Sequence, residues 1–201
     1  MLKLNFDIGP LRAASDKLRG FSPSARAAAL NTALKTVAKR GATVARKESS
    51  AEYNLKQATI GARMSVSVDR PNLRATIKAR SSKSNRIPLK AFGATKFKVR
   101  NKEKGGAKYL TGVKVRIRRK GEEVKLRHAF IATMPNGYVG VFQREDAGTK
   151  RLKIKEVTGL DVPQMFVGRR VKPAVIAKML EVAPGLVLHE MVRKLQSLGF
   201  K

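Results

Sequence analysis

The spacing of apolar residues predicts a long helix near the start of the chain. Between residues 23 and 50 they recur with helical spacing in an alanine-rich background. They are Leu30, Leu34, Val37 and Val44. Ser22 and Pro23 supply a capping residue followed by proline at the first helical position. Gly41 lies on the same stripe and predicts a closely approaching neighbour or a kink. A second short helical piece is expected at about 54–62.

From residue 63 the apolar period drops to two, which predicts strands. Alternating runs at 64–68 and 73–79 flank a turn at 69–72, so these residues are expected to form a β-hairpin. A third strand is expected through Ile87-Pro88-Leu89, at a sheet edge because proline donates no hydrogen bond. Turn signals and alternation predict the remaining strands at 113–119, 123–133, 138–144 and 151–157.

The helical period returns after Pro173 and continues to Gly199, with a kink or a split expected at Pro184-Gly185. The apolar stripe of this helix comprises Val175, Met179, Leu180, Val187, Met191, Leu195 and Leu198. Helices that precede and follow a run of strands are typical of the α+β class. We expect a single domain over 1–201, with one mostly antiparallel sheet of five to seven strands. Its parts are a helical segment at 22–62, a sheet at 63–157 with a long basic arm at 93–112, and a Gly/Pro loop and C-terminal helix at 158–201.

The charge of the chain changes what this fold is expected to do. The 201 residues include 44 Lys or Arg and 14 Asp or Glu, a formal net charge of +30, while the hydrophobic share of 42% is that of a globular protein. Such a charge attracts phosphate backbones and other polyanions and disfavours an isolated compact monomer. The composition therefore favours a binding or structural protein over an enzyme.

Candidate catalytic chemistry is sparse. The sequence has no cysteine, and His128 and His189 have no spacing that indicates a metal site. No phosphate loop and no Gly-x-Ser-x-Gly motif occurs. His128 shares strand parity with Val124 and Leu126 and is expected to face the core. We therefore predict no catalytic residue, no metal and no cofactor. No secretory signal or membrane span is visible, so a soluble protein made inside the cell is expected.

The basic residues are concentrated in the middle of the chain. Residues 83–127 hold sixteen Lys or Arg and three Glu. The centre of this stretch, 94–111, is rich in Gly and Lys and is expected to project as a loop, with the following strand as its base. The predicted contacts to DNA or to an acidic partner are Lys96, Lys98, Arg100, Lys102, Lys104, Lys108, Lys114, Arg116 and Arg118. Because aromatic residues make up only 5% of the chain, any DNA contact is expected to be to the backbone and independent of sequence.

A candidate interface follows the arm. Leu152 and Ile154 form an apolar pair on a strand whose other face carries Arg151, Lys153 and Lys155. Residues 151–167 are interpreted as a strand and an ordered loop that dock on a neighbouring subunit, with burial in the chain's own sheet as the alternative. The predicted interface residues are Leu152, Ile154, Val162, Pro163 and Met165.

Three stretches together resemble the minor tail protein Z family of long-tailed bacteriophages. They are Arg86 to Phe92 (RIPLKAF), Gly112 to Val115 with Ala129 to Met134 and Gly137 to Arg144, and Arg151 to Met165 (RLKIKEVTGLDVPQM). The last stretch is similar to the Leu-Pro-Ile-x-x-Leu-x-Gly-Pro-x-Val-Pro ending of such proteins, with Lys153 and Leu160 where the family usually has proline.

The resemblance implies a non-enzymatic virion protein that acts late in tail assembly at the head-proximal end of the tail tube. It further implies a homo-oligomeric, six-fold ring, tail-tube, terminator and neck proteins as partners, genomic DNA as a further one, synthesis in the host cytoplasm and no membrane contact. A ribosomal or RNA-chaperone protein would share the charge, and a DNA-binding regulator could track phosphates with Arg26, Lys35, Lys39, Arg40, Arg46 and Lys47. These two alternatives stay open at this point.

Overall fold

The computed structural model describes residues 2–5, 22–69, 71–72, 74–80, 86–100, 109–144, 153–167 and 170–197. The chain divides into two compact units. Unit 1 comprises Met1–Glu48, Ile60–Ser81 and Val162–Lys201, and unit 2 comprises Ser49–Thr59 and Ser82–Asp161. The predicted α+β class is confirmed, since helices lie at both ends of a run of antiparallel strands. The single domain stays a prediction.

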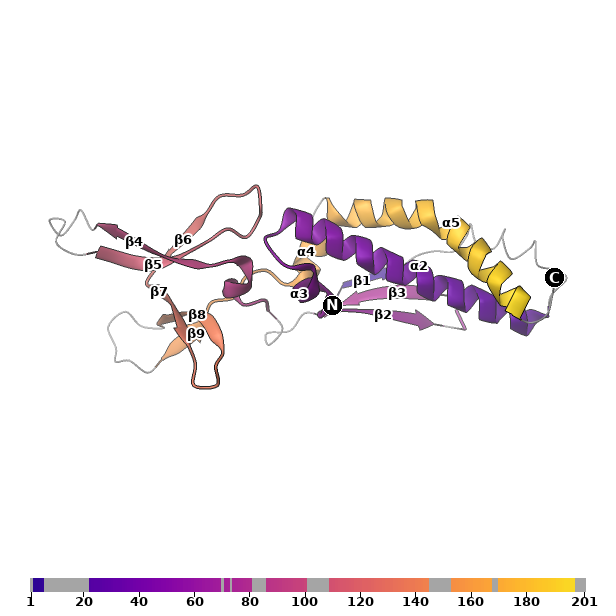
Figure 1. The fold of residues 1–201 in the computed structure, drawn as a ribbon, viewed down its shortest axis with the longest axis horizontal. Coiled ribbons are helices and arrows are strands. Elements are labelled where there is room, and N and C mark those ends of the chain that lie inside the picture. The colour runs from indigo at the N-terminus through magenta and orange to yellow at the C-terminus, as the bar shows by residue number, and fades with distance from the viewer. Residues whose placement is uncertain are drawn as a thin grey trace. The chain divides into compact units, whose positions relative to one another are not determined.

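Unit 1 begins with strand β1 (Leu2–Asn5), which the sequence analysis did not predict, and continues with the long helix α2 (Pro23–Glu52). The predicted cap is confirmed, because the Ala25 amide donates to Ser22 Oγ at 3.3 Å. The helix packs on a three-stranded sheet of order β1-β3-β2, in which β2 (Met64–Asp69) and β3 (Arg74–Ala79) form the predicted hairpin. Figure 1 shows α2 running alongside this sheet. The short helix α3 (Gln57–Gly61) stands at the predicted second helical piece.

Two C-terminal helices complete unit 1. Helix α4 (Val162–Val167) occupies a segment expected to be loop, and α5 (Val171–Ser197) lies alongside α2 (Figure 1). Helix α5 is not split at Pro184, although Figure 1 shows that it bends along its length. Gly41 allows the close approach expected of it, because a Cβ at this position would lie 3.0 Å from Met179 Cε on α5. Leu180, expected in the buried stripe, is 58% exposed.

Unit 2 holds two separate three-stranded antiparallel sheets. One has the order β4-β5-β6, with β4 (Thr95–Arg100), β5 (Tyr109–Val115) and β6 (Val124–Arg127). The other has the order β7-β8-β9, with β7 (Ala129–Thr133), β8 (Val139–Arg144) and β9 (Ile154–Glu156). With the sheet of unit 1, the described residues thus form three sheets instead of the single sheet of five to seven strands that was expected.

The break between the two sheets of unit 2 lies at His128. Its φ of 67° is in the left-handed region, which interrupts the strand expected over 123–133. The turn at Pro135-Asn136-Gly137 is confirmed, with the Gly137 amide donating to the Met134 carbonyl at 2.9 Å. Two other predictions are wrong in detail. Residues 89–92 form a 3₁₀ helix, η2 (Leu89–Phe92), and the strand expected at 113–119 ends at Val115.

The core of unit 2 joins segments that lie far apart in the sequence. The Gly159 amide donates to the Ile87 carbonyl at 2.8 Å, and Pro88 forms an isolated antiparallel bridge with Thr158. Ile87 and Phe92 are fully buried, and the Phe92 ring lies against Gly159. Asn54 donates from Nδ2 to the Phe92 carbonyl at 2.7 Å. These contacts fix the base from which β4 starts.

Candidate nucleic-acid interface

The β4-β5-β6 sheet carries cations on one face through β4. Lys96 is paired with Val113, Lys98 with Thr111 and Arg100 with Tyr109. Positions along a strand alternate between faces, so Lys96 and Lys98 share one face of the sheet, and Arg100 holds the next position of the same parity. The side chains of Lys96 and Lys98 are exposed. The arm is therefore a β-hairpin over its described part, instead of the expected loop, and its strand geometry spaces the cations evenly.

The opposite face of the same sheet is also basic. Lys114 is paired with Thr95 and Lys125, and Arg127 is paired with Gly112. Directly paired residues of antiparallel strands place their side chains on the same face. Lys114 therefore shares a face with Thr95, and Lys96, the next residue along β4, lies on the other face. Lys114 Nζ lies 3.5 Å from Glu123 Oε2, so this cation already has an anionic partner. The Phe97 ring packs over Gly112, where an added Cβ would lie 2.8 Å from its Cε1.

Two of the predicted contact residues lie beyond the end of β5. Arg116 is exposed. The Arg118 guanidinium lies 5.9 Å from the centre of the Tyr53 ring, and its Nε is 3.9 Å from Glu52 Oε1. This cation–π contact and ion pair tie residues 52–53 to the loop after β5, so Arg118 has a structural role within unit 2. Lys102, Lys104 and Lys108 lie outside the described residues.

The structure divides the predicted interface residues into two kinds. Val162 and Met165 are fully buried within the chain, on helix α4, so their side chains are not presented on its surface. Ile154 on β9 is 40% exposed, and Pro163 is partly exposed. Leu152 lies outside the described residues. The interface itself stays a prediction, and among the described residues it depends chiefly on Ile154.

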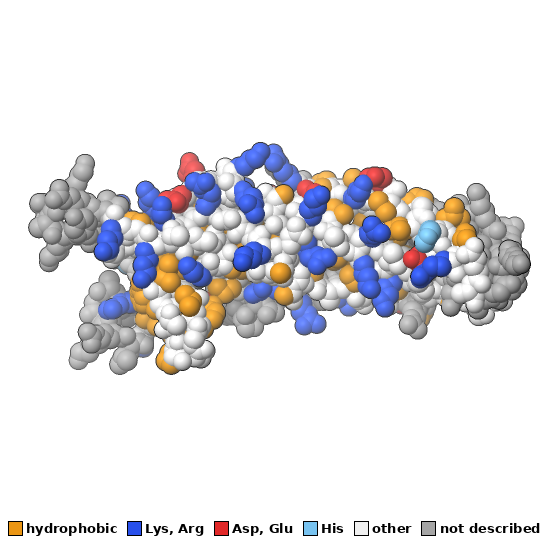
Figure 2. Space-filling view, viewed as in Figure 1, with side chains coloured by type: hydrophobic (Ala, Val, Ile, Leu, Met, Phe, Trp, Pro, Cys, Tyr) orange, Lys and Arg blue, Asp and Glu red, His pale blue; other side chains and the backbone are white. Residues whose placement is uncertain are grey.

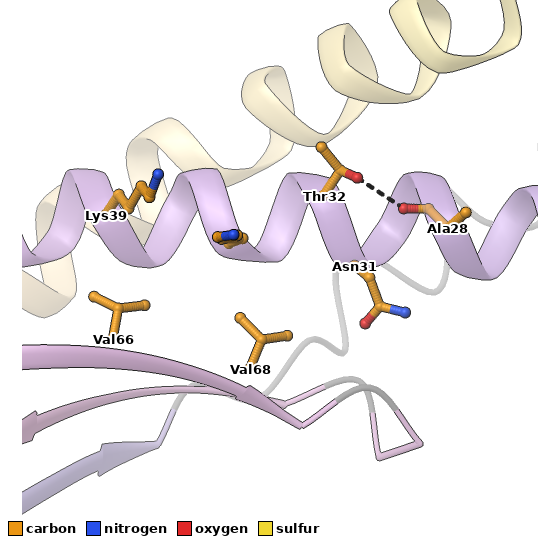
Figure 3. A pocket seen from close by; sticks show the side chains of 7 residues that line it. Ala28, Asn31, Thr32, Lys39, Val66 and Val68 are labelled. Carbon is orange, nitrogen blue, oxygen red and sulfur yellow. Dashed lines mark hydrogen bonds between the residues drawn. The ribbon is translucent and has the colours of Figure 1, made fainter.

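A second basic surface follows α2 in unit 1. Lys35, Lys39 and Lys47 are exposed and are spaced by multiples of four, so they form one ridge along the helix. Lys35 and Lys39 also line a groove of about 620 Å³ between α2 and β2. The side chains of Val66 and Val68 point from β2 toward the helix there (Figure 3). The other residues that line it are Ala28, Asn31 and Thr32, and the set includes no acid.

The sequence analysis named the lysines of this ridge but missed the groove. The available signal was the small size of Ala28, Asn31 and Thr32, three residues of α2 that line the groove. Side chains of this size leave space above Val66 and Val68 where larger apolar ones would close it. In Figure 3 the Thr32 hydroxyl donates to the Ala28 carbonyl of its own helix, at 3.0 Å.

Among the residues that the structure describes, no group of three or more His, Cys, Asp or Glu residues could hold a metal ion. His128 is exposed at the strand break instead of facing the core, which corrects the expectation from its parity. The parity argument failed because the face of β6 that it took as the core is itself exposed at Val124, and because the φ of His128 interrupts the strand. His189 is exposed on α5. None of the helices that the structure describes is apolar over a length sufficient to span a bilayer.

Comparison with known families decides the class of the protein. A family model described as prophage minor tail protein Z (GPZ) matches residues 10–195. The chain belongs to this family. It is a phage minor tail protein, and so a structural component of the virion. Comparison with curated proteins gave no match, and neither did comparison with solved structures.

The segments by which the sequence resembles this family are brought together in the minor tail protein. Arg86 to Phe92 pairs with the stretch that includes Thr158 and Gly159, and the Val157 amide donates to the Val141 carbonyl at 2.8 Å. These segments contribute buried residues such as Ile87, Phe92 and Val141 to the core of unit 2. They also carry exposed cations, among them Lys90 and Lys155, whereas Lys96 and Lys98 of β4 lie outside them.

Proposed function

We propose that this minor tail protein is a non-enzymatic component of tail completion, acting at the head-proximal end of the tail tube as a ring around the DNA channel. Membership of the family supports a structural role in the tail. The net charge of +30 supports a position next to the phosphate backbone, because several such chains in one particle require anions to offset their repulsion. Figure 2 shows Lys and Arg side chains spread over the visible face, with few Asp or Glu among them.

The single observation that supports DNA contact most directly is the face of β4. Lys96 and Lys98 are exposed on it, and the register adds Arg100. Alternate residues of a strand are about 6.6–6.8 Å apart, close to the phosphate spacing along one DNA strand. The opposite face is the weaker candidate because Lys114 is already paired with Glu123.

The role in tail completion is tested in infected cells. A phage with a nonsense codon early in this gene is expected to give full heads and tail tubes that fail to form infectious particles. The wild-type protein supplied from a plasmid should restore infectivity. Electron microscopy counts free heads, free tails and joined particles. Normal yields of joined, infectious particles without the protein would contradict the role in tail completion.

The DNA contact is tested with two triple variants of equal charge. Lys96→Gln, Lys98→Gln and Arg100→Gln remove one face, and Lys114→Gln, Lys125→Gln and Arg127→Gln remove the other as the matched control. Each phosphate contact contributes about −0.9 to the slope of log affinity against log salt, so loss of three contacts flattens it by roughly 2.7. Binding to random-sequence duplex is measured by fluorescence anisotropy.

We expect the first triple variant to show the flatter slope and the control to keep the wild-type slope. Equal loss in both variants would indicate attraction by net charge alone and would contradict a specific DNA-facing surface. Binding of the wild-type protein to an acidic tail protein, with no affinity for duplex, would assign this face to a protein partner instead.

A further inference from the structure

Helix α5 carries two parallel rows of apolar residues, each with a spacing of four. The first row packs inside unit 1 and contains Val171, Val175, Met179 and Met191, all buried. The second row is displaced from the first by one residue and contains Ile176, Leu180, Pro184, Leu188 and Val192. Leu180, Leu188 and Val192 are 58%, 54% and 45% exposed. We call this second row the outer ridge.

The position of the outer ridge on the helix explains why unit 1 leaves it uncovered. Successive residues of a helix are separated by about 100°, so the second row lies a little more than a quarter turn around the helix from the buried row. Both rows keep the same spacing and therefore stay separate along the whole helix, including the stretch beyond Pro184. Figure 2 shows apolar side chains gathered over the region of α5. A continuous apolar row on a helix surface is typical of a contact with another protein.

The charge around the outer ridge indicates which protein covers it. Between Lys178 and Arg193 the sequence has no Lys or Arg and contains Glu181 and Glu190, in a chain whose net charge is +30. Two copies of this basic chain repel each other over most of their surface. At the outer ridge they can approach without bringing Lys or Arg side chains face to face. The basic residues that flank the ridge pair within the chain, Lys178 with Glu181 at 2.6 Å and Arg193 with Glu190 at 2.9 Å. The surface around the ridge is therefore close to neutral, so a second copy can cover it without charge repulsion.

We propose that the outer ridge of α5 is a contact between two copies of this chain, with the ridge of one packed against the ridge of the other. Rows with a spacing of four pack into each other at the commonest helix-crossing angle, about −50°. In an antiparallel pair centred between Pro184 and Leu188, Leu180 lies level with Val192 of the second copy. Glu181 then lies within one helical turn of Arg193 of the second copy, so the pairs that these residues form with Lys178 and Glu190 in one chain can be exchanged for a pair across the contact.

This inference deepens the proposed function and rests on it for the presence of several copies in one particle. The proposed contact is isologous and joins two copies only, so closing a ring requires a second, head-to-tail contact. The contact itself is a property of the purified chain, so it can be tested without phage. Failure of the complementation experiment would overturn the role in tail completion, and failure of the experiment below would overturn the α5 contact.

The test compares two valine substitutions in the full-length protein. Val192→Lys lies on the outer ridge, and Val124→Lys on β6 is the matched control, because these valines are 45% and 46% exposed. Leu188→Lys is a second ridge variant at the centre of the contact. Sedimentation equilibrium at physiological salt measures self-association, and far-UV circular dichroism with thermal melting checks that each variant stays folded.

We expect the wild-type protein and Val124→Lys to form dimers or larger assemblies with the same affinity. Both ridge variants should associate at least tenfold more weakly while keeping their fold. A wild-type protein that sediments as a monomer at its highest soluble concentration would overturn the proposal. Ridge variants that associate as tightly as the control would do the same, since the copies would then meet through another surface.

Discussion

At the scale of single residues, two glycines show how strongly the surroundings decide the effect of the same substitution. A Cβ on Gly159 would lie 2.5 Å from Cε2 of Phe92, a ring that is fully buried in unit 2. Nothing lies within 4 Å of a Cβ on Gly185, which is inside helix α5. The first glycine is required for close packing, and the second only lowers the helical propensity of its segment.

Gly159→Ala is expected to destabilise the protein by about 1–3 kcal/mol, because the added methyl group displaces a packed ring. Gly185→Ala, the control, is expected to stabilise it by roughly 0.5–1 kcal/mol, because alanine is the better helix former. Chemical denaturation of both variants and the wild type gives the two differences in unfolding free energy. A Gly159→Ala variant as stable as the wild type would show that Phe92 can move without cost.

At the scale of elements, one backbone angle divides the strands of unit 2 into two sheets. His128 has a φ of 67° between the end of β6 and the start of β7. Side chains branched at Cβ strongly disfavour this conformation, whereas glycine adopts it freely. The exposed imidazole makes no contribution to the core, so the backbone angle is what the position requires.

Substitutions at His128 test this requirement. His128→Val is expected to cost about 1–2 kcal/mol of unfolding free energy, because valine is strained in the left-handed region. His128→Gly should leave stability within about 1 kcal/mol of the wild type and should leave infectivity unchanged. Thermal melting and plaque counts provide the two measurements. Loss of infectivity in a folded His128→Gly variant would assign the imidazole a chemical role.

At the scale of the whole molecule, repulsion among the many Lys and Arg residues lowers the stability of the fold. A net charge of +30 on 201 residues raises the free energy of the compact state through mutual repulsion of Lys and Arg. Salt shortens the range of this repulsion, from about 10 Å at 0.1 M to about 3 Å at 1 M. The free protein is therefore expected to be less stable than the same protein with its cations neutralised by a polyanion.

The melting temperature should rise between 0.1 M and 1 M potassium chloride, by about 2–4 °C for each kcal/mol of repulsion that is screened. The triple variant Lys35→Gln, Lys39→Gln and Lys47→Gln, which lowers the charge of the exposed α2 ridge, should show a smaller rise. Differential scanning calorimetry measures both. A melting temperature that falls with salt in the wild type would mean that favourable ion pairs outweigh the repulsion.

The sequence by itself determined the elements whose signals are local. Helical spacing and a Ser-Pro cap located α2, because each turn of a helix depends on residues three or four positions apart. Alternation and a four-residue turn located the β2–β3 hairpin for the same reason. The charge and the three family-like stretches were also readable directly, and they led to the tail protein family that the comparison confirmed.

Only the tertiary structure decided how these elements combine. Sequence alternation predicted one strand across His128, but a single left-handed angle separated two sheets there. Pro88 was assigned to an edge strand, whereas its segment pairs with Thr158, about seventy positions away in the chain. Register and long-range packing also decide three further features. They are the exposure of Leu180, the placement of Lys96 and Lys114 on opposite faces of one sheet, and the burial of Val162 and Met165. Local spacing shows which residues share a face, but what covers that face depends on chain segments that the local pattern does not contain.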